Sequence, residues 1–149
     1  MENNLSITEL LYKKSKPIDQ LSVLDGILLI VEEQRKASID VKKASKSIEE
    51  VINSITKHLL SSEIGRLIYV GAGTSGRIGL QDGVELFPTF NWPKERLDFI
   101  IAGGLKSILE AVENAEDSTK EASKIVETKK INSDDVVICL AASGNTPFT

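Results

Sequence analysis

The stretch of residues 68–77 constrains this chain more than any other part of its sequence. Its letters are IYVGAGTSGR: an apolar strand pattern ends at two glycines, two hydroxyl residues and a third glycine follow, and a helical pattern then begins. Glycines let the main chain approach an anion closely, and the unpaired N–H groups at a helix start point toward that anion. The pattern therefore predicts a phosphate-binding loop whose contacts come from Gly73, Thr74, Ser75 and Gly76.

The length and composition narrow the class of protein. The chain has 149 residues, which suits one domain or most of one, and 41% of them are hydrophobic, which is enough to bury a core. Its net charge of −4 argues against a nucleic-acid partner. No apolar run approaches the roughly 20 residues that a membrane helix needs, and residues 1–4 are unlike a signal peptide. The single cysteine, Cys139, is expected to be a small buried hydrophobic residue, and we expect a cytoplasmic protein.

The first 60 residues have the pattern of helices. Residues 6–9 resemble a capping box that opens a short helix, a second helix is predicted over 19–34, and Ser38 is expected to cap a third. Apolar residues recur along the third helix at steps of three and four, namely Val41, Ala44, Ile48, Val51, Ile52, Ile55 and Leu59. We therefore assign residues 1–60 to an N-terminal helical region and residues 61–149 to a second domain.

Strands and helices alternate after residue 66. Strands are predicted over 67–70, 97–102 and 135–141, with helices over about 75–86, near 108–112 and after the capping residue Ser118. The third strand is almost wholly apolar, which is typical of a strand buried on both faces of a parallel sheet. The order is that of a βαβαβ unit with right-handed crossovers. The predicted fold class is α/β: a helical region followed by an incomplete doubly wound, flavodoxin-like parallel sheet with three strands.

All three predicted strands end in small or hydroxyl residues, at the edge where α/β sheets bind ligands. The loop after the third strand adds a second group of phosphate contacts, Ser143, Gly144 and Thr146. The spacing Gly71-x-Gly73-x-x-Gly76 also fits a dinucleotide-binding loop, but the second strand then ends in two glycines, where that site wants an acidic residue. A glycine-rich turn without a ligand is the third interpretation.

Five blocks of sequence carry a family resemblance: residues 69–77, 82–90, 101–104, 111–117 and 141–147. In this order and spacing they resemble N-acetylmuramic acid 6-phosphate etherase, a family of the sugar isomerase (SIS) domain superfamily. The resemblance implies a lyase that converts N-acetylmuramic acid 6-phosphate to N-acetylglucosamine 6-phosphate and D-lactate. It implies no metal and no organic cofactor.

The resemblance also assigns roles to three glutamates. It implies that Glu85 is the acid/base residue, that Glu116 is the second acidic site residue, and that Glu113 hydrogen-bonds sugar hydroxyls. In the expected chemistry a carboxylate removes the C2 proton of the open-chain sugar, lactate leaves C3, and water then adds to the unsaturated aldehyde. Two structural interpretations compete: Glu85 as a solvated residue near a helix end, and Glu116 as a charge that favours the start of the next helix. His58 is interpreted as a surface or packing residue.

The position of Glu85 raises a problem of distance. It lies ten residues beyond the predicted helix start at Ser75, which is about 15 Å along a helix axis. A sugar whose phosphate is bound at the helix start cannot span that distance to C2. We therefore expect Glu85 to enter the site of a second subunit across a two-fold interface, and so expect a homodimer.

The chain departs from the family in composition and in length. Leu86 and Phe87 occupy positions where the family usually has a cysteine and a proline. Asn114 replaces a usual glycine, and Asn145 replaces a common arginine. These changes leave open a non-catalytic SIS module that binds a phosphosugar, or an inactive fragment. Family members are about twice as long, so the third strand is expected at an unpaired edge, with a separately encoded C-terminal half as one partner. The length also fits a shortened chain or a split or decayed reading frame, and we expect the chain alone to be poorly stable or self-associated and weakly active.

Overall fold

A computed structural model of the chain describes residues 16–149, so the capping box predicted at residues 6–9 lies outside the described residues. The chain divides into two compact units after Ile55, a point inside helix α2 (Ser45–Leu60). None of the helices in the described range is long and apolar enough to cross a membrane.

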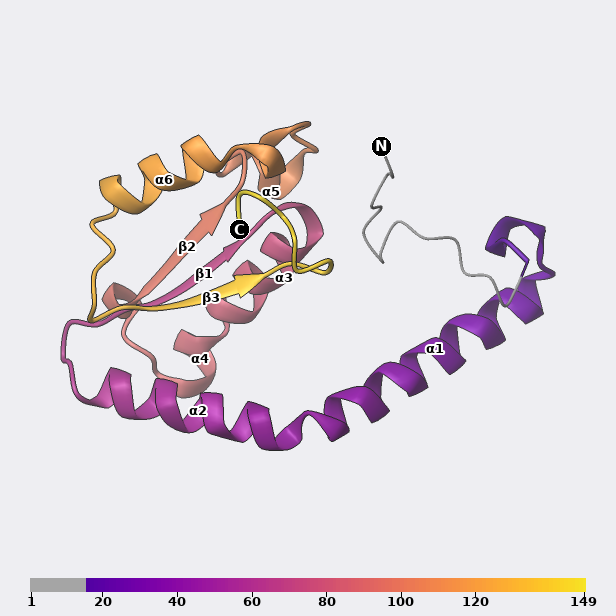
Figure 1. The fold of residues 1–149 in the computed structure, drawn as a ribbon, viewed down its shortest axis with the longest axis horizontal. Coiled ribbons are helices and arrows are strands. Elements are labelled where there is room, and N and C mark those ends of the chain that lie inside the picture. Colours follow the sequence, from indigo (N-terminus) through magenta and orange to yellow (C-terminus); the bar gives the residue numbers. More distant parts are fainter. Residues whose placement is uncertain (1–15) are drawn as a thin grey trace, which may run out of the picture. The chain divides into compact units, whose positions relative to one another are not determined.

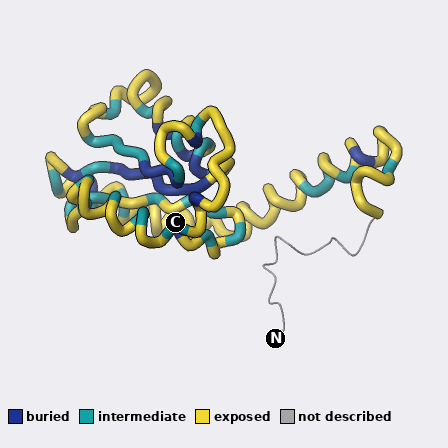
Figure 2. Tube along the Cα trace, turned by 90° about the horizontal axis from the view of Figure 1, so that it is seen from above, coloured by how far each residue is buried: buried dark blue, intermediate teal, exposed yellow. Residues whose placement is uncertain are grey.

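The first unit is built from a short 3-10 helix, η2 (Ile18–Gln20), helix α1 (Val23–Lys43) and the start of α2. Ser22 caps α1, because its hydroxyl accepts a hydrogen bond from the Asp25 N–H at 3.1 Å. The prediction that Ser38 caps a new helix was wrong: α1 continues through it, and its hydroxyl donates to the Arg35 carbonyl at 2.8 Å. Figure 2 shows how little of α1 is buried.

The second unit is organised around a parallel sheet of three strands in the order β2-β1-β3 (Figure 1). The strands are β1 (Leu67–Gly71), β2 (Leu97–Ile101) and β3 (Val136–Leu140). Leu67 pairs with Leu97 on one side and with Val136 on the other. This order is that of the first three strands of a flavodoxin-like sheet, so the predicted fold class is confirmed.

Helices cover both faces of the sheet, with α3 (Gly73–Val84) on one side and α6 (Thr119–Thr128) on the other (Figure 1). Alternate residues of β1 point to opposite faces. Tyr69 lies against the α3 glycines, whereas Ile68, with 0% exposure, belongs to the core that Ala122 and Ile125 of α6 cover. Ser118 caps α6 as predicted, accepting a hydrogen bond from the Glu121 N–H at 3.3 Å.

Four short elements complete the unit: α4 (Leu86–Phe90), η3 (Lys94–Arg96), α5 (Lys106–Leu109) and η4 (Ala115–Asp117). The helix predicted over 75–86 begins two residues earlier and ends at Val84, and the helical stretch predicted near 108–112 ends at Leu109. His58, interpreted as a surface or packing residue, is half-buried in α2 with Nε2 3.2 Å from the Asp134 carbonyl oxygen.

Strand β3 lies at the edge of the sheet and is the least buried of the three strands. Two predictions about it were wrong: it is not buried on both faces, and Cys139 is exposed. The reason is that Val137 and Cys139 share the face of Ile68 and Val70, where the packed residues of α6 reach only β1 and β2.

Candidate functional site

A cavity of about 170 Å³ opens at the carboxyl ends of β1 and β2, where a ligand site was predicted. Its walls come from the start of α3, the end of β2 and the segment around α5 and η4. The lining residues are Ala72, Gly73, Arg77, Ala102, Ser107, Glu110, Ala111, Val112, Glu113, Asn114, Ala115 and Glu116.

The start of α3 has the geometry of an anion-binding loop. Gly73 has φ +51°, a conformation that favours glycine, and a Cβ at this position would meet nothing within 4 Å. Ala72 is the N-cap and supplies no side-chain hydrogen bond, so no protein side chain caps the helix start. Thr74 is exposed and Ser75 is half-buried, which leaves the loop open to a ligand. The free first-turn N–H groups and the helix dipole favour an anion here.

Gly76 has a different environment from the other residues of the predicted loop. It is buried, and its N–H already donates to the Ala72 carbonyl at 3.1 Å. A Cβ on Gly76 would lie 2.9 Å from the backbone of Gly71, so this glycine lets α3 pack directly on β1. Its observed contacts are those of helix–strand packing.

Arg77 ends the motif of residues 68–77 and lines the cavity, although no role was predicted for it. Its Nη1 donates to the Ser107 carbonyl at 2.8 Å, and its Nη2 donates to the Thr74 hydroxyl at 3.3 Å. Among residues 16–149 it is the only cationic residue that lines the cavity, whereas three glutamates line it. The signal that could have found it is its position four residues after Gly73, on the same side of the helix.

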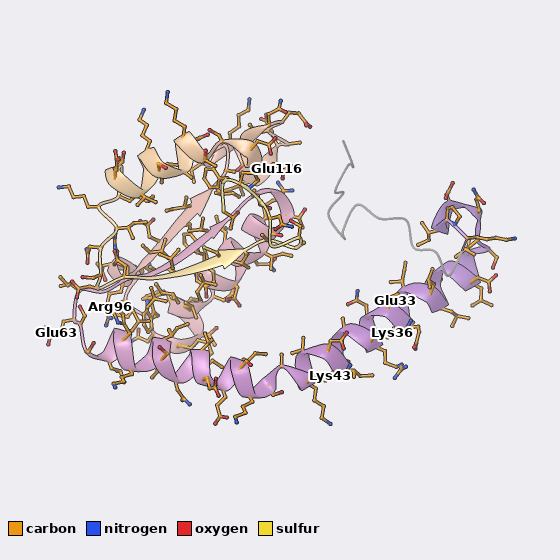
Figure 3. The ribbon with its side chains drawn as sticks, viewed as in Figure 1. Glu33, Lys36, Lys43, Glu63, Arg96 and Glu116 are labelled. Atoms are coloured by element: carbon orange, nitrogen blue, oxygen red, sulfur yellow. The ribbon has the colours of Figure 1, made fainter. Side chains whose placement is uncertain are left out.

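The structure brings two of the three predicted glutamates to the cavity. Glu113 and Glu116 are exposed and line it, together with Glu110. The Glu116 carbonyl accepts a hydrogen bond from the N–H of Phe148, whose side chain is 3% exposed in the core. Figure 3 shows Glu116 at this end of the sheet.

Glu85 lies away from this cavity. It is exposed and forms the C-cap of α3, directly before α4. Gly73 and Glu85 are at opposite ends of α3, a helix of 12 residues, which is about 18 Å long. Within one chain, Glu85 is therefore not brought together with the other predicted site residues.

The loop after β3 also stays outside the cavity lining. The Ser143 hydroxyl accepts a hydrogen bond from the Asn145 N–H at 3.1 Å, and the Gly144 N–H donates to the Ala141 carbonyl at 3.2 Å. The Thr146 carbonyl accepts from the Thr149 N–H at 3.0 Å. These contacts fold the loop on itself. In the described part of the chain, no group of three or more His, Cys, Asp or Glu side chains is placed to hold a metal ion.

Comparisons with known proteins agree with this arrangement. The sequence model of the "Glucokinase regulatory protein N-terminal SIS domain" family matches residues 44–149. The chain is 41% identical over 142 residues to N-acetylmuramic acid 6-phosphate etherase of Pasteurella multocida (strain Pm70), a match that covers 95% of this chain and 46% of that protein. It is also 41% identical over 148 residues to the etherase of Bacillus cereus (strain B4264), covering 99% of this chain and 49% of that protein.

The chain thus spans about half the length of the curated relatives that it matches. The match begins inside the helical region and continues through all three strands and the whole cavity. The resemblance drawn from the five sequence blocks is confirmed. The chain belongs to the SIS domain family that is represented by the N-terminal SIS domain of glucokinase regulatory protein.

Proposed function

We propose that the cavity binds a phosphosugar, with the phosphate at the start of α3 and the sugar toward the glutamates. The observation that carries this proposal is the convergence of Gly73, Glu113 and Glu116 on one cavity at the carboxyl ends of the strands. Main-chain N–H groups and the Thr74 and Ser75 hydroxyls suit the phosphate, and Ser143, Gly144 and Thr146 are further candidate contacts if their loop closes over it. Carboxylates suit sugar hydroxyls because they accept hydrogen bonds.

The size of the cavity supports a site that a second surface completes. Its volume of about 170 Å³ is below the roughly 300–1,000 Å³ of typical small-molecule pockets. A cavity of this size encloses part of a phosphosugar and leaves the rest exposed. In the homodimer that we propose, a second copy covers the exposed part and brings Glu85 to the sugar.

We further propose that the reaction is the carbon–oxygen elimination of N-acetylmuramic acid 6-phosphate, in the cytoplasm, without a metal or organic cofactor. The names of the relatives support this choice. Glu85 of one copy removes or returns the C2 proton. Glu116 is the second acid/base group, while Glu113 orients the sugar. Since lactate leaves from C3 as a carboxylate-bearing alcohol, one of the two acid/base glutamates must supply its proton.

A non-catalytic phosphosugar-binding module is the alternative. The distance of Glu85 from the cavity within one chain supports it. A module of this kind needs the loop at the start of α3 but no acid/base pair.

Measurements of ligand binding and of catalytic turnover distinguish these two functions. We expect calorimetry to detect N-acetylmuramic acid 6-phosphate binding to the chain, and we expect Gly73→Val to weaken it at least tenfold, because a side chain would occupy the anion position. Gln81→Ala, an exposed change later in α3, is the matched control and should leave the affinity unchanged. D-lactate release supports the lyase, whereas binding without release supports the module. An affinity that is the same for Gly73→Val as for the unmodified chain would refute the site.

The shared site has its own test. A Glu85→Gln chain and a Ser75→Ala chain should each be inactive alone, and mixing them should restore part of the activity if Glu85 acts in the partner's cavity. Activity that stays absent in mixed dimers, after exchange of subunits is verified by mass, would contradict the shared site.

A further inference from the structure

The outer side of α3 carries an exposed stripe that runs from one end of the helix to the other. It consists of Thr74, Ile78 and Glu85, which lie four and seven residues apart and so share one side of the helix. Ile78 is 56% exposed, although it is a large aliphatic residue. The opposite side of α3 is closed, because its three buried glycines pack on the sheet. The α3 stripe is therefore the side on which a further contact can form.

The charges of α3 are distributed unevenly along the helix. Arg77 lies in the N-terminal half, whereas Asp82 and Glu85 lie at the C-terminal end. The helix dipole has the same sense, positive at the start and negative at the end. Two copies of α3 in antiparallel orientation therefore place opposite charges side by side, whereas parallel copies would place like charges together. In charge, α3 is complementary to a second copy of itself.

Exposed apolar side chains are found at both ends of α3. Helix α4 follows its C-terminal end, and α5 adjoins its N-terminal half through the Arg77–Ser107 hydrogen bond of 2.8 Å (Figure 1). The most exposed apolar residues of these two helices are Phe90 at 72%, Leu105 at 81% and Leu109 at 91%. Clustered apolar exposure is typical of an interaction surface. Antiparallel pairing of α3 brings α4 of each copy to α5 of the other.

A two-fold axis across the α3 stripe exchanges its two ends. The midpoint between Thr74 and Glu85 lies in the middle of the helix, close to Ile78. Glu85 of a second copy then lies beside Thr74 and next to Gly73, which lines the cavity. Packed helices lie about 8–10 Å apart, whereas Glu85 of the same chain is separated from Gly73 by the length of α3, about 18 Å. The pairing thus brings Glu85 closer to the partner's cavity than to its own.

We propose that two copies of this chain pair through antiparallel α3 helices, with Ile78 at the two-fold axis. Such an interface is isologous, so each residue near the axis faces its own copy. The exposed apolar residues of α4 in one copy pack on those of α5 in the other. Glu85 of each copy stands at the mouth of the partner's cavity. This inference rests on the homodimer of the proposed function and adds the surface through which the two copies meet.

The test uses opposite charges at Ile78 in the chain of 149 residues. Ile78→Asp and Ile78→Lys should each weaken the dimer at least tenfold in analytical ultracentrifugation, because each places like charges together at the axis. A mixture of the two variants should form a heterodimer at least tenfold tighter than either variant alone. The matched control is Val126→Asp, which changes a side chain of similar exposure (45%) on α6 and should dimerise within twofold of the unmodified chain.

Chemical cross-linking tests the position of the axis. Cys139→Ser removes the single cysteine of the chain and provides the background. In this background, Ile78→Cys should be linked to its own copy by a short bismaleimide, whereas Val126→Cys should stay unlinked. Circular dichroism checks that each variant is folded.

Three results would overturn the proposal. The first is a chain that stays monomeric, which would also remove the homodimer from the proposed function. The second is a dimer that Ile78→Asp weakens no more than Val126→Asp does. The third is a dimer that both Ile78 variants weaken and their mixture does not restore, which would place Ile78 away from the axis. In the last two cases the homodimer and the phosphosugar site, which calorimetry tests separately, would stand and only the surface would be wrong.

Discussion

At the amino ends of the strands, charged side chains are paired with one another, whereas at the carboxyl ends they line a cavity. Arg66 holds Asp135 through Nη2–Oδ2 and Nε–Oδ1 contacts of 2.7 and 3.0 Å, and Lys129 holds Asp98 at 2.7 Å. At the other end, Glu113 and Glu116 are exposed. Figure 3 labels one charged residue at each end: Arg96 at the amino ends, where it donates to the Gly65 and Leu59 carbonyls, and Glu116 at the carboxyl ends.

The two ends of the sheet therefore contribute to different properties: the amino ends to stability and the carboxyl ends to ligand binding. The paired end satisfies its charges within the protein, so its contribution is to the free energy of unfolding. The cavity end has one exposed ion pair, Lys106–Glu110 at 3.3 Å, while Glu113, Glu116 and the first-turn N–H groups of α3 remain open to the cavity, so this end stabilises the fold less. Substitutions at the two ends should therefore have different effects, and four predictions test this.

The largest effect should come from a tightly packed point at the carboxyl end, where α3 meets β1. In Gly76→Val, the new side chain would begin 2.9 Å from the Gly71 backbone, which cannot move without separating β1 from α3. We expect a loss of about 3 kcal/mol or more in the free energy of unfolding, measured by urea denaturation. Gln81→Ala on the exposed side of the same helix should change it by less than about 0.5 kcal/mol. A Gly76→Val protein as stable as the control would contradict the close packing of α3 on β1 at this point.

Breaking the pairing at the amino ends should have the next largest effect. Arg66→Met leaves the Asp135 carboxylate, whose side chain is 1% exposed, without its main partner. We expect a loss of about 3 kcal/mol, because an unpaired buried charge is costly. The matched control is Arg35→Met on α1, which breaks an exposed pair with Glu32 and should cost at most about 0.5 kcal/mol. Equal losses in both variants would argue against a special role for the amino-end network.

Low pH should also reduce the stability contributed by the amino ends, by less than the Arg66→Met substitution does. The Arg66 guanidinium, which hydrogen-bonds the Asp135 carboxyl, lowers the pKa of that group from 3.8 to about 2. Because the pKa is lower in the folded state, the stabilisation is complete above the unfolded pKa and is lost as the pH falls from about 4 to about 2. Its size is about 2 kcal/mol.

Urea denaturation as a function of pH checks this value. Asp135→Asn should be less stable than the unmodified chain at neutral pH and should show a smaller loss between pH 4 and pH 2. An unchanged slope in Asp135→Asn would assign the acid sensitivity to other carboxyls.

The contrast between the ends also explains which features the sequence could predict. The strands and the binding edge follow from short apolar runs that end in glycines, which are local signals. The exposure of Cys139 depends on which strand lies at the edge of the sheet. The sequence of one apolar strand does not show which other strands will lie beside it. Ser38 carries a helix-capping residue type, yet residues 33–37 before it are good helix formers and no glycine or proline separates them from it, so α1 continues through Ser38. The contact of Arg77 with Ser107 joins residues 30 positions apart, and no local pattern reports it.

The smallest effect on stability, with a larger effect on binding, should come from Arg77. Its hydrogen bond to the Ser107 carbonyl joins the N-terminal part of α3 to the wall formed by α5, and it lines the cavity together with three glutamates. Arg77→Met should cost about 1 kcal/mol of stability and accelerate amide exchange in Lys106–Leu109. Phosphosugar affinity should fall about tenfold, since a charge-assisted hydrogen bond is worth roughly 1.5–3 kcal/mol and part of that is screened at this half-exposed position.

Arg77→Lys distinguishes the charge of this residue from its geometry. Lysine retains the positive charge but has no planar fork with which to contact Ser107 and Thr74 together. If the contact with Ser107 sets the width of the cavity, exchange in α5 should stay fast and the affinity low in Arg77→Lys, as in Arg77→Met. If the affinity recovers while exchange in α5 stays fast, only the charge of Arg77 matters. Binding would then not require α5 to be held in place. The carboxyl ends would differ from the amino ends only in having charged groups that are free to bind a ligand.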